Sequence, residues 1–436
     1  MPDRCGQSLH SSSVRSLPAD AKRRLLAGLS DDEARALLYD WEFWARPEQL
    51  APAGEWFVWL LRSGRGFGKT RTGAEWVIQR AAGGFRRIAL VGQSKADVRD
   101  TMVEVGDSAL LRISPPWFMP HYEPSKRRLT WPNGAMAVVY SGDEPDQLRG
   151  PQHDSAWVDE LAKFKYPQAT WDNLMFGLRI GARPQAVVTT TPRPIPLIRR
   201  LMAAATTVDV QRSSYDNLAN LAPTYVREVL EKYQGTRLGR QEIEGAIMDD
   251  APGALWKRAN IEAQRALQAP TLERVVVAVD PSASTEGDAA GIVAAGTARD
   301  PVHRTQHLYV LDDATVQGSP LTWAKAAVTA YHVFRADRIV AETNNGGEMV
   351  EALIRQVDAT VAYKAVHASR GKQVRAEPVA AIYEQGRGHH VGMFALLEDE
   401  LCQWEPGGAS PNRLDALVWA ATELMLGGGT PVAYAY

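Results

Sequence analysis

A glycine-rich segment early in the chain has the residue types of a phosphate-binding loop. An apolar run, 56–61, precedes it and a helix-compatible stretch, 71–80, follows it. Glycines let backbone N–H groups converge on phosphate oxygens, a lysine can reach the β- and γ-oxygens, and a hydroxyl can ligate Mg²⁺. Ser63 replaces the glycine that usually opens such a loop. The segment predicts a nucleotide site built from Gly64, Arg65, Gly66, Phe67, Gly68, Lys69 and Thr70.

Two consecutive carboxylates follow another apolar run, 156–158, and could complete that site. Nucleotide hydrolysis on a phosphate loop needs an acidic group at the end of a buried strand. Asp159 is placed to hold Mg²⁺ through water, and Glu160 to polarise the attacking water. Taken alone, such a pair is more often the solvated acidic end of a strand, so the prediction depends on the pair and the loop together.

Hydroxyl, guanidinium and amide groups near these motifs are further candidates. Thr190 or Thr191, after the run 187–189, could sense the γ-phosphate, and Gln49, after an aromatic cluster, could read an adenine edge. Arg65 and Arg149 could each neutralise charge on the γ-phosphate, one within the chain and the other across a subunit boundary. The residues do not decide which arginine does which. Strand packing and ordinary surface arginines are the alternatives.

Three carboxylates in the second half indicate a different chemistry. Asp280 ends the run 275–279, Glu342 ends the run 339–341, and Asp415 lies at the start of a helical stretch. Two Mg²⁺ or Mn²⁺ ions about 3.5–4 Å apart, held by such carboxylates, hydrolyse phosphodiesters. Asp288 is a candidate fourth, peripheral ligand. Any one of these groups alone is more often structural, so the three together carry the prediction.

Basic residues are concentrated between the second and third of these carboxylates, in 363–390. Residues 369–372 have the composition of an exposed turn that could hold a DNA backbone next to the metal ions. Arg370, Lys372 and Arg375 are the candidate DNA-binding residues. A solvated basic loop is the alternative.

Short apolar runs separated by helix-length segments must position these groups. The runs fall into two sets, which predicts two α/β domains, the first with a parallel sheet. A helical lead-in at 20–39, with Ser30 as a cap, precedes the first set. We expect disorder at 1–18, a linker at 235–262 and a flexible tail at 427–436. The runs are 56–61, 88–91, 135–140, 156–158 and 186–189, then 275–279, 291–295, 307–311 and 338–341.

Composition restricts the classes of protein that fit. The 436 residues include 49 Lys and Arg against 51 Asp and Glu, a net charge of -2, so a polyanion must be held by local basic patches. Only two cysteines occur, Cys5 and Cys402, which excludes a disulfide scaffold and fits a reducing compartment. The sequence has no run of about 18 apolar residues, so we expect no membrane span and a cytoplasmic protein.

These motifs, in this order, resemble the large terminase subunit of tailed bacteriophages and of phage-derived gene transfer agents. The resemblance runs from 40 to the C-terminal helix and is carried by 64–76, 148–152, 157–161, 189–192 and the surroundings of Asp280, Glu342, 369–372 and Asp415. It implies an N-terminal P-loop (ASCE) ATPase domain at 19–234, a linker subdomain at 235–262 and an RNase H-like nuclease domain at 263–426. Thr190 or Thr191 is then the coupling motif and Arg149 a candidate arginine finger.

The resemblance also implies a function and partners. ATP hydrolysis would drive double-stranded DNA into a procapsid through the portal, and a two-metal endonuclease would cut concatemeric DNA. The implied partners are the portal protein, the procapsid, the small terminase subunit and other copies of the chain in a ring, a pentamer. The implied location is the bacterial host cytoplasm, and transiently the portal vertex. A repair helicase-nuclease and a prophage remnant that only binds DNA are the alternatives.

Overall fold

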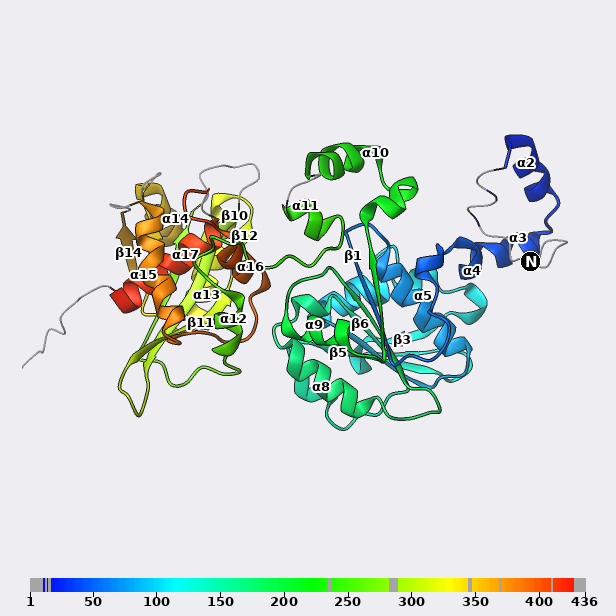
Figure 1. Ribbon diagram of the computed structural model, residues 1–436, viewed down its shortest axis with the longest axis horizontal. Coiled ribbons are helices and arrows are strands. Elements are labelled where there is room, and N and C mark those ends of the chain that lie inside the picture. The colour runs from blue at the N-terminus through cyan, green and yellow to red at the C-terminus, as the bar shows by residue number, and fades with distance from the viewer. Residues whose placement is uncertain are drawn as a thin grey trace, which may run out of the picture. The chain divides into compact units, whose positions relative to one another are not determined.

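The computed structural model describes residues 11, 14, 17–233, 237–281, 289–343, 347–367, 371–408 and 411–426 (Figure 1). Two compact units, 1–248 and 249–436, divide the chain. The boundary falls inside the predicted linker, 235–262, and the described parts of that segment pack on their own units. Asp288, Arg370, the tail 427–436 and most of 1–18 lie outside the described residues.

The first unit is built on an eight-stranded sheet. Its order is β3-β4-β5-β2-β6-β7-β1-β8, and all neighbours from β5 to β8 are parallel. Because β1, β7 and β6 are adjacent and parallel, the phosphate loop, Thr190 and Asp159 follow or end strands at one edge of the sheet. All five runs predicted for this half are strands, whereas β3, β4 and β8 were not predicted. The strands are β1 (Val58–Ser63), β2 (Arg87–Gly92), β3 (His121–Glu123), β4 (Arg128–Thr130), β5 (Met136–Ser141), β6 (Ser155–Asp159), β7 (Gln185–Thr190) and β8 (Thr207–Arg212).

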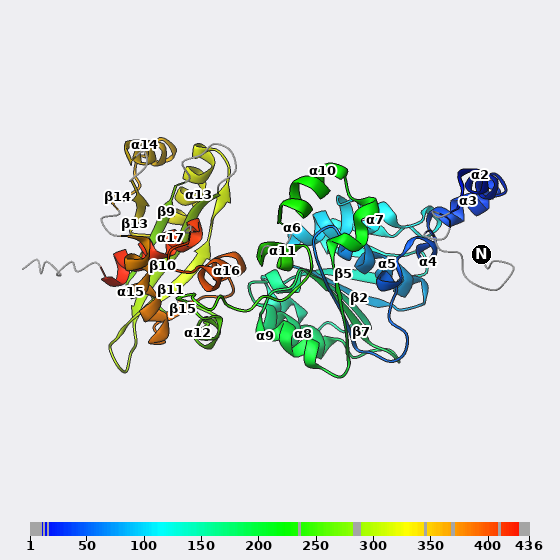
Figure 2. The same cartoon turned by 45° about the horizontal axis from the view of Figure 1, so that its top comes forward.

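Helices cover both faces of this sheet. Helix α5 packs on a core that includes Trp59, Leu90 and Trp157, while α8 and α9 lie together across the sheet in both views (Figures 1 and 2). The side chain of Ser30 forms the capping box of α3, which confirms the predicted lead-in. The helices are α2 (Ala19–Ala27), α3 (Asp31–Leu38), α4 (Trp41–Trp44), α5 (Lys69–Ala82), α6 (Lys95–Asp97), α7 (Leu110–Ile113), α8 (Pro167–Gly177), α9 (Pro196–Ala203), α10 (Pro223–Tyr225) and α11 (Arg237–Glu242). Short 3₁₀ and π turns are η1 (Pro47–Gln49), η2 (Val98–Glu104), η3 (Pro116–Phe118), η4 (Pro124–Lys126), η5 (Pro145–Leu148), η6 (Leu161–Lys163), η7 (Ser214–Asn220) and η8 (Val226–Glu231).

The second unit contains a seven-stranded mixed sheet in the order β14-β13-β9-β10-β11-β15, with β12 paired to β10. Strands β9, β10 and β11 are antiparallel neighbours, and β13 runs parallel to β9. Asp280 and Glu342 end two adjacent parallel strands and therefore share an edge of the sheet. The strands are β9 (Arg274–Asp280), β10 (Ala289–Arg299), β11 (Gln306–Asp313), β12 (Val316–Gln317), β13 (Arg338–Glu342), β14 (Tyr363–Val366) and β15 (Gly388–His390).

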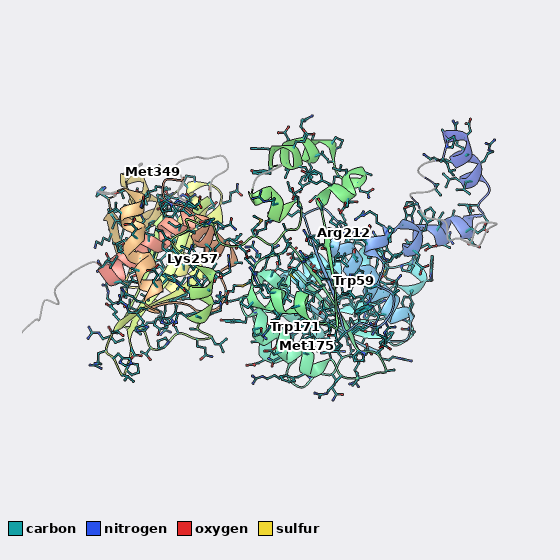
Figure 3. All side chains as sticks on the ribbon, in the orientation of Figure 1. Trp59, Trp171, Met175, Arg212, Lys257 and Met349 are labelled. Atoms are coloured by element: carbon teal, nitrogen blue, oxygen red, sulfur yellow. The ribbon has the colours of Figure 1, made fainter. Side chains whose placement is uncertain are left out.

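Alternate residues of these strands enter two cores, as a period of two requires. Val276 and Ala278 pack with α12, α15, α16 and α17, whereas Val277 and Val279 pack with α13 and α14. Trp59 lies inside the first unit, while Met349 stands on the outside of α14 (Figure 3). The helices are α12 (Arg258–Ala263), α13 (Pro320–Val333), α14 (Gly347–Val357), α15 (Lys372–Glu384), α16 (Ala395–Gln403) and α17 (Asn412–Ala421), followed by the turn η9 (Thr422–Leu426).

The described parts of the basic segment 363–390 are mostly regular structure, and the predicted turn 369–372 falls between β14 and the start of α15, partly outside the described residues. The segment forms β14, helix α15 and β15, and Lys372 is the first residue of α15. Ala376, Val379, Ala380 and Tyr383 recur at helical spacing and are buried, which explains why this stretch is a helix. None of the helices in the described ranges is sufficiently long and apolar for a membrane crossing.

Candidate functional site

The phosphate loop connects the end of β1 to the start of α5. Gly68 has φ of 102°, in the left-handed region that favours glycine. A Cβ on Gly64 would lie 2.0 Å from the carbonyl oxygen of Ile243, so only glycine fits there. Ser63 has no positive φ, and its tolerance at the first position follows from that. The ammonium of Lys69 donates to the carbonyls of Ser63, at 3.0 Å, and Gly64, at 3.2 Å.

A cavity of about 300 Å³ lies against this loop. Four separate segments line it: the loop with the start of α5, Ser108 before α7, the turn after β6, and the residue after β7. It brings together predicted residues from three of these segments and adds Arg71, Ser108 and Lys163, which the sequence reasoning missed. The lining is Arg65, Gly66, Gly68, Lys69, Thr70, Arg71, Ser108, Glu160, Lys163 and Thr191.

Asp159 ends β6 beside this cavity and is buried. Its Oδ1 accepts a hydrogen bond of 2.6 Å from the hydroxyl of Thr189, which itself accepts from the indole of Trp157 at 2.8 Å. Burial, and next the charge of Glu160, raise the pKa of Asp159 above its usual value. A cation beside Asp159 would stabilise its charged carboxylate, so Asp159 fits the role of an Mg²⁺ partner.

Glu160 adopts a left-handed backbone, with φ of 55°, which is uncommon outside glycine and occurs at functional sites. The amide of Thr191 donates to Glu160 Oε2 at 3.1 Å, and the Thr191 hydroxyl donates to Oε1 at 3.3 Å. Lys163 lies 3.3 Å and Lys69 3.9 Å from the carboxylate. Burial by itself would raise the pKa of Glu160, but the two lysines and the Thr191 amide outweigh burial and lower it.

The two threonines proposed to sense the γ-phosphate differ in their contacts. The Thr190 hydroxyl accepts from the amide of Ala162 at 3.2 Å and donates to the Thr191 carbonyl at 3.1 Å. Thr191 instead lines the cavity and contacts Glu160. Of the two, Thr191 is the one in contact with the catalytic candidates.

Other candidates engage different partners. Arg65 lines the cavity, yet its guanidinium pairs with Glu242 at 2.6 Å. Gln49 donates to the Thr72 hydroxyl at 3.1 Å and the Gly68 carbonyl at 3.5 Å, so its amide supports the loop. Arg149 is exposed and pairs with Asp146 at 3.1 Å, and it does not line the cavity.

Two further residues hold the loop and carry no signal in the sequence. Arg46 donates to Asn217 Oδ1 at 2.6 Å and to the carbonyl of Phe67, and its guanidinium lies 4.6 Å from the centre of the Phe67 ring. Asn217 donates to the carbonyl of Gly66 at 2.6 Å. Arg46 and Asn217 are 171 positions apart, so only the fold brings them to the loop.

In the second unit, Asp280, Glu342 and Asp415 face one another closely enough to interact electrostatically. Burial, then Asp415 and Glu342, raise the pKa of Asp280 to about 7, while Lys372 and Arg375 oppose the rise. Lys372 Nζ lies 2.9 Å from Asp415 Oδ2, and Arg375 Nη1 lies 3.7 Å from Glu342 Oε2. The structure therefore places these two predicted DNA-binding cations on the carboxylates.

Aromatic packing orients the same cluster. The indole of Trp419 donates to Glu342 Oε2 at 2.8 Å, and the Arg375 guanidinium lies 4.4 Å from the centre of the Trp419 ring. Among the described residues, no three His, Cys, Asp or Glu side chains are arranged to hold a metal ion as they stand. The donor set still fits a hard divalent cation, because burial, and next the neighbouring carboxylates, raise the pKa of Asp280, and such an ion would stabilise its charged form.

Comparisons with known proteins agree with this two-site layout. Residues 60–263 match the family described as terminase large subunit, T4likevirus-type, N-terminal, and residues 277–423 match the terminase RNaseH-like domain. No curated protein is significantly similar in sequence.

Several solved structures are also similar, all at low identity. The large terminase of a thermophilic bacteriophage is 12% identical over 89% of this chain and 98% of that chain, with a TM-score of 0.42. The Thermus phage P74-26 large terminase ATPase domain is 14% identical over 50% and 98%, with a TM-score of 0.39. The nuclease domain of the large terminase subunit of bacterial virus Sf6 is 16% identical over 38% and 96%, with a TM-score of 0.28. Through its two family matches, the chain belongs to the large terminase subunits, the DNA-packaging motors that join an ATPase domain to an RNase H-like nuclease domain.

Proposed function

We propose that this chain hydrolyses ATP in the cavity at Lys69 to move double-stranded DNA through the portal into a procapsid, and that Asp280, Glu342 and Asp415 form the nuclease that cuts concatemeric DNA. The observation that carries the first half is the convergence of the loop, the turn after β6 and the residue after β7 on one cavity of about 300 Å³. Stability alone does not require a buried lysine beside two carboxylates.

Each residue of the ATPase site has a distinct role in this proposal. Lys69 contacts the β- and γ-oxygens, while Thr70 and Asp159 hold Mg²⁺, which neutralises phosphate charge when bound. Glu160 polarises the attacking water, and its lowered pKa keeps it anionic for that task. Arg65 neutralises the γ-phosphate once it leaves Glu242.

Other residues are proposed to couple ATP hydrolysis to movement or to act on the nucleotide of a neighbouring subunit. Thr191, with Thr190 behind it, links the γ-phosphate to the end of β7, and its contact with Glu160 supports that role. Arg149, exposed and outside the cavity lining, suits an arginine finger directed at a neighbouring subunit. Gln49 remains the candidate for the adenine edge.

In the nuclease, Asp280, Glu342 and Asp415 would hold two divalent ions, Mg²⁺ or Mn²⁺, which activate water and stabilise the leaving oxygen. Asp288 is the peripheral ligand in this proposal. Lys372 and Arg375, with Arg370, would transfer to the DNA backbone as metal ions take over the carboxylates. The ion pairs that Lys372 and Arg375 make at present support such an exchange of partners.

We further propose the assembly in which these activities work. A ring of copies, a pentamer, would dock on the portal, receive DNA from the small terminase subunit, and act in the host cytoplasm at the portal vertex. If Arg149 acts on the nucleotide of a neighbouring copy, each ATPase site is completed only when copies assemble in the ring.

One set of assays on the purified chain tests the proposal. ATP turnover and plasmid cleavage with Mg²⁺ or Mn²⁺ are measured for the unmodified chain, Lys69→Ala and Asp280→Ala. Each variant should lose one activity and keep the other. Stimulation of ATP turnover by procapsids bearing a portal separates a packaging motor from a repair helicase-nuclease. Unchanged turnover in Lys69→Ala contradicts the ATPase assignment.

A further inference from the structure

Lys163 is a lysine of the nucleotide cavity that no motif singled out. It ends the 3₁₀ turn η6, in which its amide donates to the carbonyl of Glu160 at 2.8 Å. Residues three apart in a 3₁₀ turn lie on the same side, so the Lys163 side chain returns to Glu160. Its ammonium lies 3.3 Å from Glu160 Oε2, and the side chain lines the cavity with Lys69 and Thr70.

The Glu160 carboxylate lies between two ammonium groups. Lys69 Nζ is 3.9 Å from Oε1 and Lys163 Nζ is 3.3 Å from Oε2, and Thr191 donates to both oxygens. Arg65 and Asp159 are the other charged groups whose fields reach it. Lysine ammonium groups and a backbone N–H therefore converge on the Glu160 carboxylate. Donors arranged in this way also bind a phosphoryl group.

We propose that Lys163 is a further catalytic residue of the ATPase, whose ammonium moves from Glu160 to the γ-phosphate when ATP binds. The inference rests on the proposed function of this cavity. In the exchange, one charge-assisted contact of Lys163 replaces another, and the carboxylate of Glu160 is released to orient water. Because ADP has no γ-phosphate, it leaves Lys163 paired with Glu160. Lys163 thus distinguishes triphosphate from diphosphate and supplies positive charge where charge develops during phosphoryl transfer.

The neighbouring Lys165 provides a control for the general positive charge of this segment. Lys165 is two residues further on, does not line the cavity, and lies 5.8 Å from the centre of the Tyr166 ring. Substituting it removes the same charge from the same segment. Lys165→Ala is therefore a matched control for general electrostatic effects.

The test compares Lys163→Met, Lys163→Arg and Lys165→Ala in the full chain, with steady-state ATP turnover, ATPγS affinity and ADP affinity as readouts. Lys163→Met should lower kcat on the order of 10- to 100-fold and weaken ATPγS binding several-fold, while ADP affinity stays within about twofold. Lys163→Arg should recover kcat to within about fivefold of the unmodified chain, because it restores the charge. Lys165→Ala should match the unmodified chain.

Three results would overturn the inference: kcat in Lys163→Met within about twofold of the unmodified chain, equal losses of ADP and ATPγS affinity, or no recovery in Lys163→Arg. Normal ADP affinity also reports that the variant site is folded. Lys69→Ala serves as the reference for the site itself. If Lys69→Ala abolishes turnover and Lys163→Met does not, the role of Lys163 is wrong and the ATPase assignment stands. If Lys69→Ala retains turnover, the assignment of the cavity is wrong.

Discussion

The two acidic sites of this protein use the same sheet geometry and differ in how their charge is compensated. Each places carboxylates at the ends of strands, β6 in the first unit and β9 with β13 in the second. In the first, Glu160 has a lowered pKa because Lys69, Lys163 and the Thr191 amide outweigh burial. In the second, burial and then Asp415 and Glu342 raise the pKa of Asp280 to about 7 despite Lys372 and Arg375, as burial also raises the pKa of Asp159, the metal-ligand candidate of the first site.

That contrast has a chemical reason. The catalytic carboxylate of the first site must be an anion that polarises water, so protein cations stabilise its charge. The three carboxylates of the second site must attract divalent ions, and protein cations that neutralised them fully would compete with the metal. We therefore expect divalent metal to bind near Asp159 in the first site and at the three carboxylates in the second, whereas Glu160 stays anionic without metal.

Removing Lys69 should give the largest effect and separate the two sites. Lys69→Ala deletes the cation that contacts the β- and γ-oxygens, so ATP turnover should fall about 10³-fold or more. Plasmid cleavage with Mn²⁺ should stay within about twofold, because the nuclease carboxylates belong to the other unit. Lys95→Ala, which removes an exposed lysine paired with Glu144, is the control and should leave both rates unchanged. Parallel loss of both activities in Lys69→Ala would contradict independent sites.

The converse substitution tests the second site. Asp280→Asn keeps the shape of the side chain and removes its charge, so metal-dependent cleavage should fall about 10²- to 10³-fold. ATP turnover should not change. The measurement is plasmid linearisation across a range of Mn²⁺ concentrations. Recovery of the cleavage rate at high Mn²⁺ would indicate that Asp280 only strengthens metal binding.

The raised pKa of Asp280 also predicts a pH dependence of stability. Its usual value of 3.8 applies to the unfolded chain and about 7 to the folded one, so the folded state binds more protons in this window. The carboxyl therefore costs stability increasingly as pH rises from 4 to 7. With EDTA present, Asp280→Asn should raise the free energy of unfolding at pH 8 by about 2 kcal/mol, discounted for partial exposure, and by almost nothing at pH 4. Denaturant titration at both pH values provides the check; equal stability of the two proteins at pH 8 would argue against the raised pKa.

The smallest expected effect concerns competition for Asp415. Lys372 Nζ pairs with its Oδ2 at 2.9 Å, so Lys372→Met should free the carboxylate and tighten Mn²⁺ binding about three- to tenfold. Calorimetric titration measures it. Lys364→Met is the matched control, because Lys364 pairs with Glu423 at 2.6 Å instead of a metal-ligand candidate. Weaker Mn²⁺ binding in Lys372→Met would show that this lysine helps to hold the metal site together.

Sequence patterns were informative wherever the structure depends on near neighbours. The order of glycines before Lys69, the acidic ends of buried runs and the Ser30 cap all follow from local geometry, and the runs became strands. The basic composition of 363–390 gave no indication of the helix within it. There the buried apolar spacing of Ala376, Val379 and Tyr383 was the stronger signal, and it forms α15.

The sequence by itself determined the chemical groups, their motifs and the family, because each depends on short stretches whose spacing is set by strand and turn geometry. Only the tertiary structure decided which groups touch: Arg46 with Asn217, Thr189 with Asp159, and Lys372 with Asp415. Such pairs join segments far apart in the chain, and no local preference encodes them. Charge compensation, and therefore the difference between the two sites, is a property of the folded chain because burial and the approach of distant cations set it together.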